Sequence, residues 1–315
     1  MTAIRVPQAR RFFARLVGVA VGLTIVGTEA MAQRERYAPL VLQLPVSARS
    51  MALGGLSVAT RDAEAVFGNP SLVGGSNTLS ITGGRYASGA STGHAASTMT
   101  IGALGVGFGV QFLDAPQRFA SSPVRSDVLT DGGAVAASNL AATVAASFSW
   151  KGLRWGIGAT YAEERSTGVR GGTLAADLGV SKTVFGGAAT AGFALQHVGH
   201  AISLDATGRA LPARLALGVA GAGHELTKWL DVGASANVAL RRDGRVLPAA
   251  GGELSYVPYE GITFALRVGG RVPELRAQRP ATAGVGLTFD RLTLDYGWED
   301  MRGKGGAHRV SVRLR

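Results

Sequence analysis

The chain has 315 residues, of which 46 are glycine and none is cysteine, with 46% hydrophobic residues, 17% charged residues and a formal net charge of +11. The glycines lack the G-X-Y period of collagen, and the hydrophobic content is too high for a disordered chain. Because cysteine is missing, disulfide frameworks, thiolate metal sites, iron–sulfur clusters and cysteine nucleophiles are excluded.

The first 32 residues have the features of an export signal. Arginines give the segment a cationic start, Leu16–Gly27 form an apolar run, and Ala30-Met31-Ala32 is a small-residue cleavage motif. The apolar run is shorter than the ~20 residues that a membrane-spanning helix needs. We therefore expect a signal peptide over residues 1–32 that is cleaved before Gln33.

Residues 33–75 precede a long region of alternating residues and differ from it. Asp62–Phe67 predict a short helical turn. This turn should end at Gly68 and Asn69, because the residue before Pro70 disfavours helical backbone. Asn69-Pro70 is by itself also a common turn dipeptide. We expect a small folded unit ahead of the first strand.

From residue 76 onward, large apolar residues alternate with small or polar ones. The pattern is clear over 153–161, 230–238, 262–269 and 292–299. Successive side chains of a strand point to opposite faces, so each segment has one apolar face and one polar or glycine-rich face. Such strands suit either a soluble β-sandwich or a membrane barrel.

Strand length and aromatic placement favour the barrel. The alternating segments run about ten residues, as tilted membrane-spanning strands do. Aromatic residues lie near the segment ends, as an interfacial girdle requires. These are Trp150, Trp155, Tyr161, Trp229, Tyr256, Tyr259, Tyr296 and Trp298. The predicted fold class is all-β, a 14-stranded antiparallel transmembrane β-barrel over residues 76–315.

The count of fourteen comes from the connections, which alternate between short turns and mostly longer loops. The predicted strands are 76–86, 93–102, 104–114, 138–150, 152–164, 172–183, 187–198, 211–222, 229–241, 246–257, 261–271, 279–289, 291–299 and 306–315. The eighth connection is expected over Gly223–Lys228, and the longest loops over 115–137 and 199–210. Outer-membrane barrels combine an even strand number with short periplasmic turns and longer external loops.

Glycines at every second position, such as Gly105, Gly107 and Gly109, belong to the inner faces of strands. A dinucleotide-binding GxGxxG needs a strand before it and a helix after it. Here the alternation continues through the glycines, so no cofactor is expected.

Short motifs at both ends carry a resemblance to a known family. Ser47–Gly55, then Ser57-Val58-Ala59 with Asp62-Ala63, and then Phe67–Leu72 resemble the opening of the PorV/PorQ outer-membrane proteins. These proteins are relatives of the FadL-type long-chain fatty-acid transporters. The tail, Leu292–Gly297 followed by His308–Leu314, is similar to the family's last two strands.

The resemblance implies a fourteen-stranded barrel whose N-terminal segment folds into the lumen as a hatch. We expect residues 33–75 to form the N-terminal extension and hatch, with a structural or gating role for Arg49, Gly54, Gly55, Asp62, Glu64, Asn69 and Pro70. Alternation turns Arg154, Arg267 and Arg309 inward, and we expect Asp62 and Glu64 to pair with such arginines rather than to act as catalytic carboxylates.

Other candidate chemistry is sparse, and the protein is expected not to be an enzyme, with no catalytic and no metal residues. His197 and His200 are expected to be a surface pair, since their spacing suits a metal on a helix better than on a strand. Glu163-Glu164 are expected on a solvated rim. The positive charge is spread along the chain without interleaved aromatics, which disfavours nucleic acid. Outer-membrane lipid and lipopolysaccharide are the expected surroundings.

Two functions follow for this monomeric protein of the bacterial outer membrane. In the first, a PorV-like component of type IX protein secretion or surface attachment engages exported proteins through external loops, chiefly 115–137. In the second, a FadL-like transporter admits small hydrophobic solutes past the hatch. The compact loops favour the first reading.

Overall fold

The computed structural model describes residues 37–55, 58–115, 137–166, 169–204, 208–302 and 305–315. The predicted signal peptide lies outside this range. Among the described residues no helix is both long and apolar enough to cross a membrane. The fold is all-β, with a few short helical turns ahead of the strands.

Fourteen antiparallel strands form one closed barrel, as the alternation predicts. They are β1 (Thr78–Tyr86), β2 (Ser91–Ile101), β3 (Leu104–Ala115), β4 (Ala137–Trp150), β5 (Leu153–Ser166), β6 (Val169–Val184), β7 (Ala189–Gly199), β10 (Arg214–Thr227), β11 (Leu230–Arg241), β12 (Val246–Tyr259), β13 (Ile262–Arg271), β14 (Gln278–Phe289), β15 (Leu292–Met301) and β16 (Gly306–Leu314). Each strand pairs with the next along the chain, and β1 closes the ring against β16 from Leu79↔Leu314 to Tyr86↔Ala307. Closure removes the exposed strand edges that would otherwise template aggregation.

The two ends of the barrel differ in their connections. At one end, called here the short-turn end, tight turns such as Lys151-Gly152 join the strands, and β1 begins. At the other, the long-loop end, β3 ends at Ala115 and β4 begins at Ala137, and the small hairpin of β8 (Ile202–Ser203) and β9 (Gly208–Arg209) follows β7.

One predicted connection is wrong. Gly223–Lys228 is not a loop, because β10 continues to Thr227 with register shifts between Gly221 and His224 and between Glu225 and Thr227. A β-bulge of this kind keeps a strand going where glycine would suggest a stop. The long-loop end also holds two short turns, residues 87–90 and 242–245.

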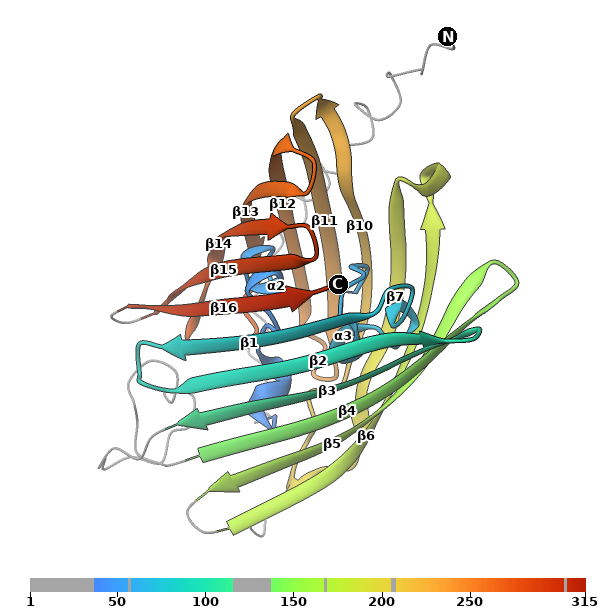
Figure 1. Ribbon diagram of the computed structural model, residues 1–315. Coiled ribbons are helices and arrows are strands. Elements are labelled where there is room, and N and C mark those ends of the chain that lie inside the picture. The colour runs from blue at the N-terminus through green and yellow to red at the C-terminus, as the bar shows by residue number, and fades with distance from the viewer. Residues whose placement is uncertain (1–36, 56–57, 116–136, 167–168, 205–207, 303–304) are drawn as a thin grey trace.

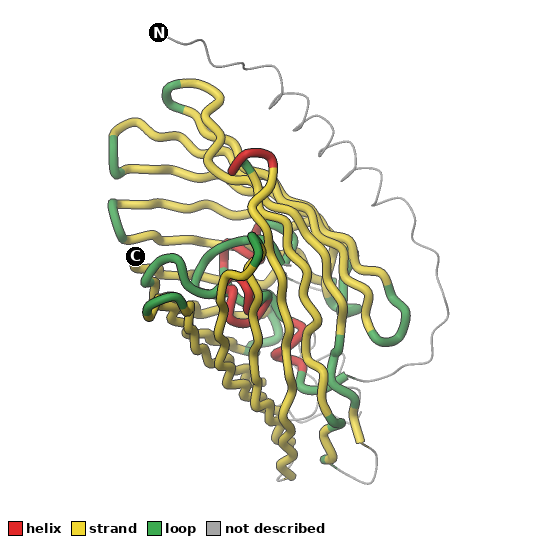
Figure 2. Tube along the Cα trace, turned by 90° about the vertical axis from the view of Figure 1, so that its right-hand side faces the viewer, coloured by secondary structure: helices red, strands yellow, loops and turns green. Residues whose placement is uncertain are grey.

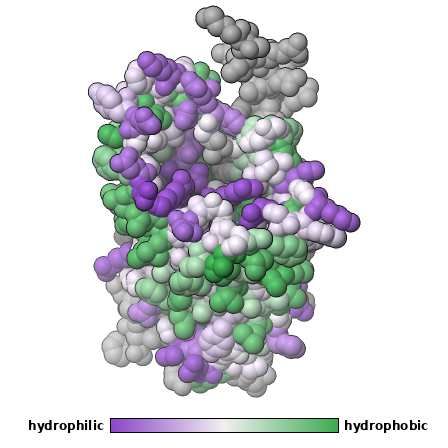
Figure 3. All heavy atoms as spheres, turned by 45° about the vertical axis from the view of Figure 1, so that its right-hand side comes forward, coloured by the Kyte–Doolittle hydropathy of each residue, from purple (hydrophilic) through white to green (hydrophobic). Residues whose placement is uncertain are grey.

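The outer wall is apolar. Large hydrophobic side chains are exposed all round it, including Ile157 at 60%, Leu266 at 56% and Val310 at 54%. Figure 3 shows hydrophobic side chains gathered across the wall, with hydrophilic ones towards both ends. An apolar patch of this extent on a monomer marks a membrane or protein contact.

Aromatic side chains mark the short-turn end of this wall. Trp150 and Trp229 are exposed there, and the Nζ atoms of Lys151 and Lys228 lie 4.6 and 4.8 Å from the ring centroids of these two tryptophans. An apolar ring beside a cation suits a membrane–water boundary.

The chain before β1 lies inside the barrel. It carries η1 (Leu40–Gln43), α2 (Ala48–Ala52), α3 (Ala65–Gly68) and η2 (Pro70–Leu72). Figures 1 and 2 show these turns within the ring of strands. We call the described residues of 37–75 the hatch. Its start lies at the long-loop end, where the Ala38 amide donates to the Ala210 carbonyl, and its last residues lie at the short-turn end, where the Gly75 amide donates to Thr100 Oγ1.

Candidate functional site

The first α-helix of the hatch, α2, packs against β13, β14, β15 and β16. Ser47 caps this helix: its hydroxyl accepts from the Ser50 amide, and the Ser50 hydroxyl accepts from the Ser47 amide. These bonds satisfy amides that a buried helix start would leave without partners. The Ala48 amide donates to Ser311 Oγ at 2.8 Å, which fixes α2 to β16.

Two predicted hatch glycines end α2 in backbone that only glycine adopts easily. Gly54 and Gly55 have φ of +92° and +90°. A Cβ at Gly54 would lie 2.9 Å from the Gly270 carbonyl oxygen on β13, so a larger residue would meet the wall as well as backbone strain. The pair therefore turns the chain where it touches the barrel.

Asn69 organises the second half of the hatch. Its side chain is fully buried, and Nδ2 donates to the Val58 carbonyl at 2.8 Å. Oδ1 accepts from both the amide and the hydroxyl of Ser71, at 3.1 and 2.7 Å. Asn69 thus caps η2, whose first residue is Pro70, and ties it to a strand-free segment eleven residues earlier. Asn69-Pro70 is therefore more than a turn.

The barrel wall is hollowed by glycine where η2 rests. A Cβ at Gly156 of β5 would overlap the backbone at Pro70 and Ser71, and one at Gly179 of β6 would overlap Asn69 Oδ1. Absent side chains on the inner face let the hatch backbone approach the strands.

The three predicted inward arginines all contact the hatch or its network. Arg154 donates to the carbonyls of Ser71 and Val73, at 3.0 and 2.7 Å. Arg309, 1% exposed, donates to the Pro45 carbonyl and to Tyr86 Oη. Backbone carbonyls, rather than the expected hatch carboxylates, are the partners of Arg154 and Arg309.

The expected pairing of Asp62 and Glu64 is wrong in detail. Asp62 faces Arg49, a residue of the hatch itself, with 3.7 Å between Arg49 Nη1 and Asp62 Oδ2. Glu64 accepts from Ser80 Oγ on β1. Neither carboxylate pairs with Arg154, Arg267 or Arg309 among the ion pairs of the described chain.

Instead, a chain of ion pairs links the hatch to the wall. From Asp62 it runs through Arg49 to Glu253 at 3.2 Å, then to Arg267, and from there to Asp295 at 2.6 Å. Arg313 Nη2 also contacts Asp295, at 2.6 Å. Glu253, Asp295 and Arg313 are not among the predicted site residues, although all three lie on the polar faces of alternating strands.

Burial acts on the charges at the hatch end of this chain. Burial, and next the negative charge of Glu64, raise the pKa of Asp62 to about 7. The pKa of Arg49 is raised above its usual value by the carboxylates of Glu253 and Asp62, against the opposing effect of burial. The Asp62 carboxyl therefore titrates near neutrality.

Three of the four predicted surface groups, His197, Glu163 and Glu164, are buried, and His200 is exposed. The amide of His197, a residue 3% exposed, donates to Asp177 Oδ1 at 2.7 Å. Glu163 and Glu164 are buried beneath arginines, with Arg165 and Arg170 against Glu163 and Arg209 against Glu164. The described residues hold no group of three or more potential metal ligands among histidines and carboxylates.

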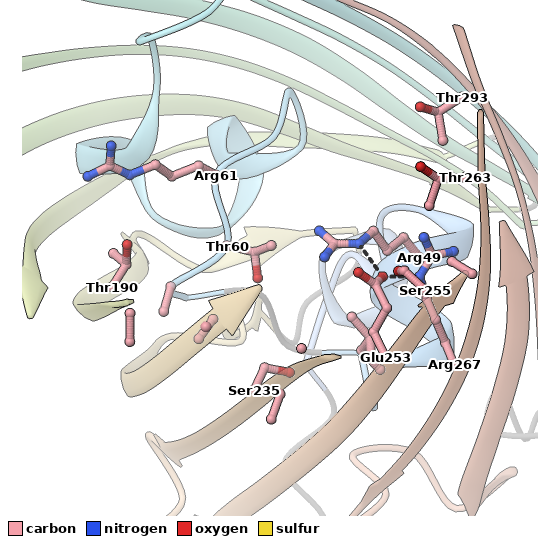
Figure 4. Close-up of a pocket in the computed structure, with 18 of the residues that line it drawn as sticks. Arg49, Thr60, Arg61, Thr190, Ser235, Glu253, Ser255, Thr263, Arg267 and Thr293 are labelled. Carbon is pink, nitrogen blue, oxygen red and sulfur yellow. Dashed lines mark hydrogen bonds and ion pairs between the residues drawn. The ribbon is translucent and has the colours of Figure 1, made fainter. Parts of the chain in front are cut away.

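The two ends of the lumen differ in polarity. At the long-loop end, Val41, Leu42 and Leu44 of the hatch pack with residues from strand ends and loops, among them Leu113, Ile202, Leu211 and Met301. At the short-turn end a cavity of about 450 Å³ lies between the hatch and the inner faces of β7 and β10–β16 (Figure 4). Five arginines and seven hydroxyl residues line this cavity, so it offers a hydrophobic molecule a more polar surface than the cluster at the long-loop end does.

Comparisons with known proteins support the fold. A scan against protein-family models finds no match, and a search of curated protein sequences finds none. Among solved structures the chain is similar to the toluene transporter TbuX of Ralstonia pickettii, at 15% identity and a TM-score of 0.56 over 88% of this chain and 100% of that one. For the toluene transporter TodX of Pseudomonas putida the identity is 12% and the TM-score 0.56, over 86% and 96% of the two chains.

A FadL homologue of Pseudomonas aeruginosa is similar to the same degree, at 11% identity and a TM-score of 0.56, over 85% of this chain and 98% of that one. At such identities the likeness shows the fold alone. The FadL-like part of the sequence resemblance is thereby confirmed at the level of fold, and the PorV/PorQ part stays a prediction.

Proposed function

We propose that the protein is a non-enzymatic transporter that passes small hydrophobic molecules across the bacterial outer membrane, with residues 37–75 as its hatch. The observation that supports this proposal most is the difference between the two ends of the lumen. An apolar cluster surrounds η1, the first turn of the hatch, at the long-loop end, and an open polar cavity lies at the short-turn end. The fold shared with two toluene transporters supports the substrate class.

Charge on the outer surface supports the orientation. Exposed arginines gather at the long-loop end, and Asp114 is the exposed carboxylate there among the described residues. The arginines are Arg85, Arg165, Arg170, Arg242, Arg276, Arg279 and Arg302. Guanidinium groups bind phosphate in a bidentate manner. We infer that this end faces the phosphates of lipopolysaccharide, as the longer loops of outer-membrane barrels do.

Engagement of exported proteins is the weaker reading. It relied on residues 115–137, which lie almost wholly outside the described part of the chain. The structural neighbours named above are transporters, and no contact in the described residues favours a secreted protein as partner over a hydrophobic solute.

Uptake measurements test the proposal. Cells lacking the protein should accumulate a radiolabelled monoaromatic hydrocarbon several-fold more slowly than cells expressing it, while uptake of a hydrophilic sugar stays equal. Equal hydrocarbon uptake in both strains, together with recovery of an exported protein from outer membranes through the long-loop end, would favour the secretion reading instead.

A lockable hatch sharpens this test. A Cβ at Gly107 would lie 2.8 Å from Val73 Cγ1, so side chains at these two positions are neighbours. Because the sequence has no cysteine, the double variant Val73→Cys/Gly107→Cys can form only one intramolecular bridge. Hydrocarbon uptake should fall on oxidation and return on reduction, so each sample is its own control.

A further inference from the structure

The cavity at the short-turn end is more basic than the proposed substrates require. Five arginines line it: Arg49, Arg61, Arg267, Arg313 and Arg315. The carboxylates of Asp62, Glu253 and Asp295 are shared among three of them through the ion-pair chain. Arg61 and Arg315 have no side-chain carboxylate partner among the ion pairs of the described residues, so the arginine side chains at the cavity outnumber these carboxylate side chains five to three.

Arg61 is placed to use that excess. Figure 4 shows its guanidinium across the cavity from the group of Arg49, Glu253 and Arg267. Arg61 Nη2 donates to Thr183 Oγ1 at 3.2 Å, and the residue is exposed. Burial, and then the like charges of Arg313 and Arg49, hold the pKa of Arg315 below its usual value, as uncompensated positive charge would.

Hydroxyl groups and small apolar residues make up most of the remaining lining, and no aromatic ring is among the described residues there. The hydroxyl residues are Thr60, Thr190, Ser235, Ser255, Thr263, Thr288 and Thr293. Arginine and hydroxyl donors together bind oxyanions strongly in a partly desolvated site. The volume of about 450 Å³ falls within the usual range for a small-molecule site.

We propose that this cavity binds an oxyanion, a carboxylate or phosphate group that enters from the short-turn end. The group is either a free anion or the head of an amphiphile whose tail extends toward the hatch. This inference goes beyond hydrocarbon transport, since a neutral hydrocarbon leaves the excess charge unused.

Titration calorimetry on the full chain in a non-ionic detergent tests it, with inorganic phosphate, acetate and decanoate as probes. Binding of phosphate or acetate identifies a free-anion site, and binding of decanoate alone identifies a head-group site. No heat from any of the three at millimolar concentration overturns the proposal.

Matched variants locate the site. Arg61→Gln should weaken anion binding at least fivefold, because it removes an excess charge while breaking one exposed hydrogen bond. Arg291→Gln, an exposed arginine at the same end that does not line the cavity, should bind as the natural chain does. Equal affinity in the Arg61→Gln and natural proteins would assign the heat elsewhere and refute the site. The hydrocarbon-uptake measurement is independent of this result, so the two proposals fail separately.

Discussion

Single buried polar groups hold the hatch in place, and Asn69 is the most connected of them. Asn69→Ala removes the donor to the Val58 carbonyl and the acceptor of both Ser71 donors. A buried polar group left unpaired costs about 1–3 kcal/mol. Trypsin should therefore cleave after Arg61 at least tenfold faster in Asn69→Ala.

The control is Asn77→Ala, an exposed asparagine just before β1. It should leave the cleavage rate within twofold of the natural chain. Heat-modifiable migration on gels monitors the barrel in both variants. If Asn69→Ala is cleaved no faster than Asn77→Ala, the bonds of Asn69 do not anchor the hatch.

Asp62 makes hatch docking depend on pH. Its pKa is raised from 3.8 to about 7 in the docked state. Below pH ~4 the docked and released states are both protonated. Between pH ~4 and ~7 the released state loses its proton first, so docking weakens as pH rises and is constant above that window.

Hydrogen exchange over residues 58–68, corrected for intrinsic rates, measures this dependence. Protection should be at least tenfold greater at pH 5 than at pH 8, and Asp62→Asn should make the two equal. Protection that increases toward pH 8 would contradict the sign.

At the scale of elements, the hatch depends on glycines that leave room for it on the inner faces of the strands. Gly156→Ala puts a methyl group into the space of the Pro70–Ser71 backbone, so η2 should be displaced while β5 keeps its pairing. Small hydrophilic solutes should then enter reconstituted vesicles severalfold faster.

Gly158→Ala is the matched control on the same strand. Its new Cβ would have its nearest atom, Asp177 Cβ, at 3.4 Å, an ordinary contact, so permeability should not change. Equal permeability in the two variants would show that η2 does not seal the lumen.

The strands were largely predictable from the sequence, and the contacts of the hatch were not. Alternation fixes which way Arg154, Arg267 and Arg309 point, because the period of a strand is two. It does not fix the stagger between strands or the path of the hatch, so it could not identify the Pro45 or Val73 carbonyls as partners. The predicted end of a strand before Gly223 is wrong, because a β-bulge accommodates the glycine within β10.

At the scale of the whole molecule, the outer wall should be stabilised by lipid contact. Leu266 is 56% exposed at the middle of β13, and Val169 is 46% exposed at the long-loop end beside Arg170. A buried arginine at the bilayer midplane costs about 2–4 kcal/mol, and one near the interface about 0–1 kcal/mol.

Leu266→Arg should therefore reduce the free energy of unfolding of the vesicle-inserted protein by the larger amount, and Val169→Arg should reduce it by the smaller amount. Urea titration of each variant in the presence of vesicles measures the difference. Equal costs at the two positions would mean that the apolar wall does not contact a bilayer of the expected thickness.

The hatch touches strands from both halves of the chain: α2 packs on β13–β16, and η2 on β4–β6. In the closed ring these two groups are separated by β1–β3 on one side and by β7 and β10–β12 on the other, and the seam that closes the ring is the pairing of β1 with β16. A segment that contacts strands on both sides of that seam can bring the last strands close to the first before β1 and β16 pair. Residues 37–75 would then serve biogenesis as an internal template, and their removal would slow the insertion of new barrels as well as open the finished ones.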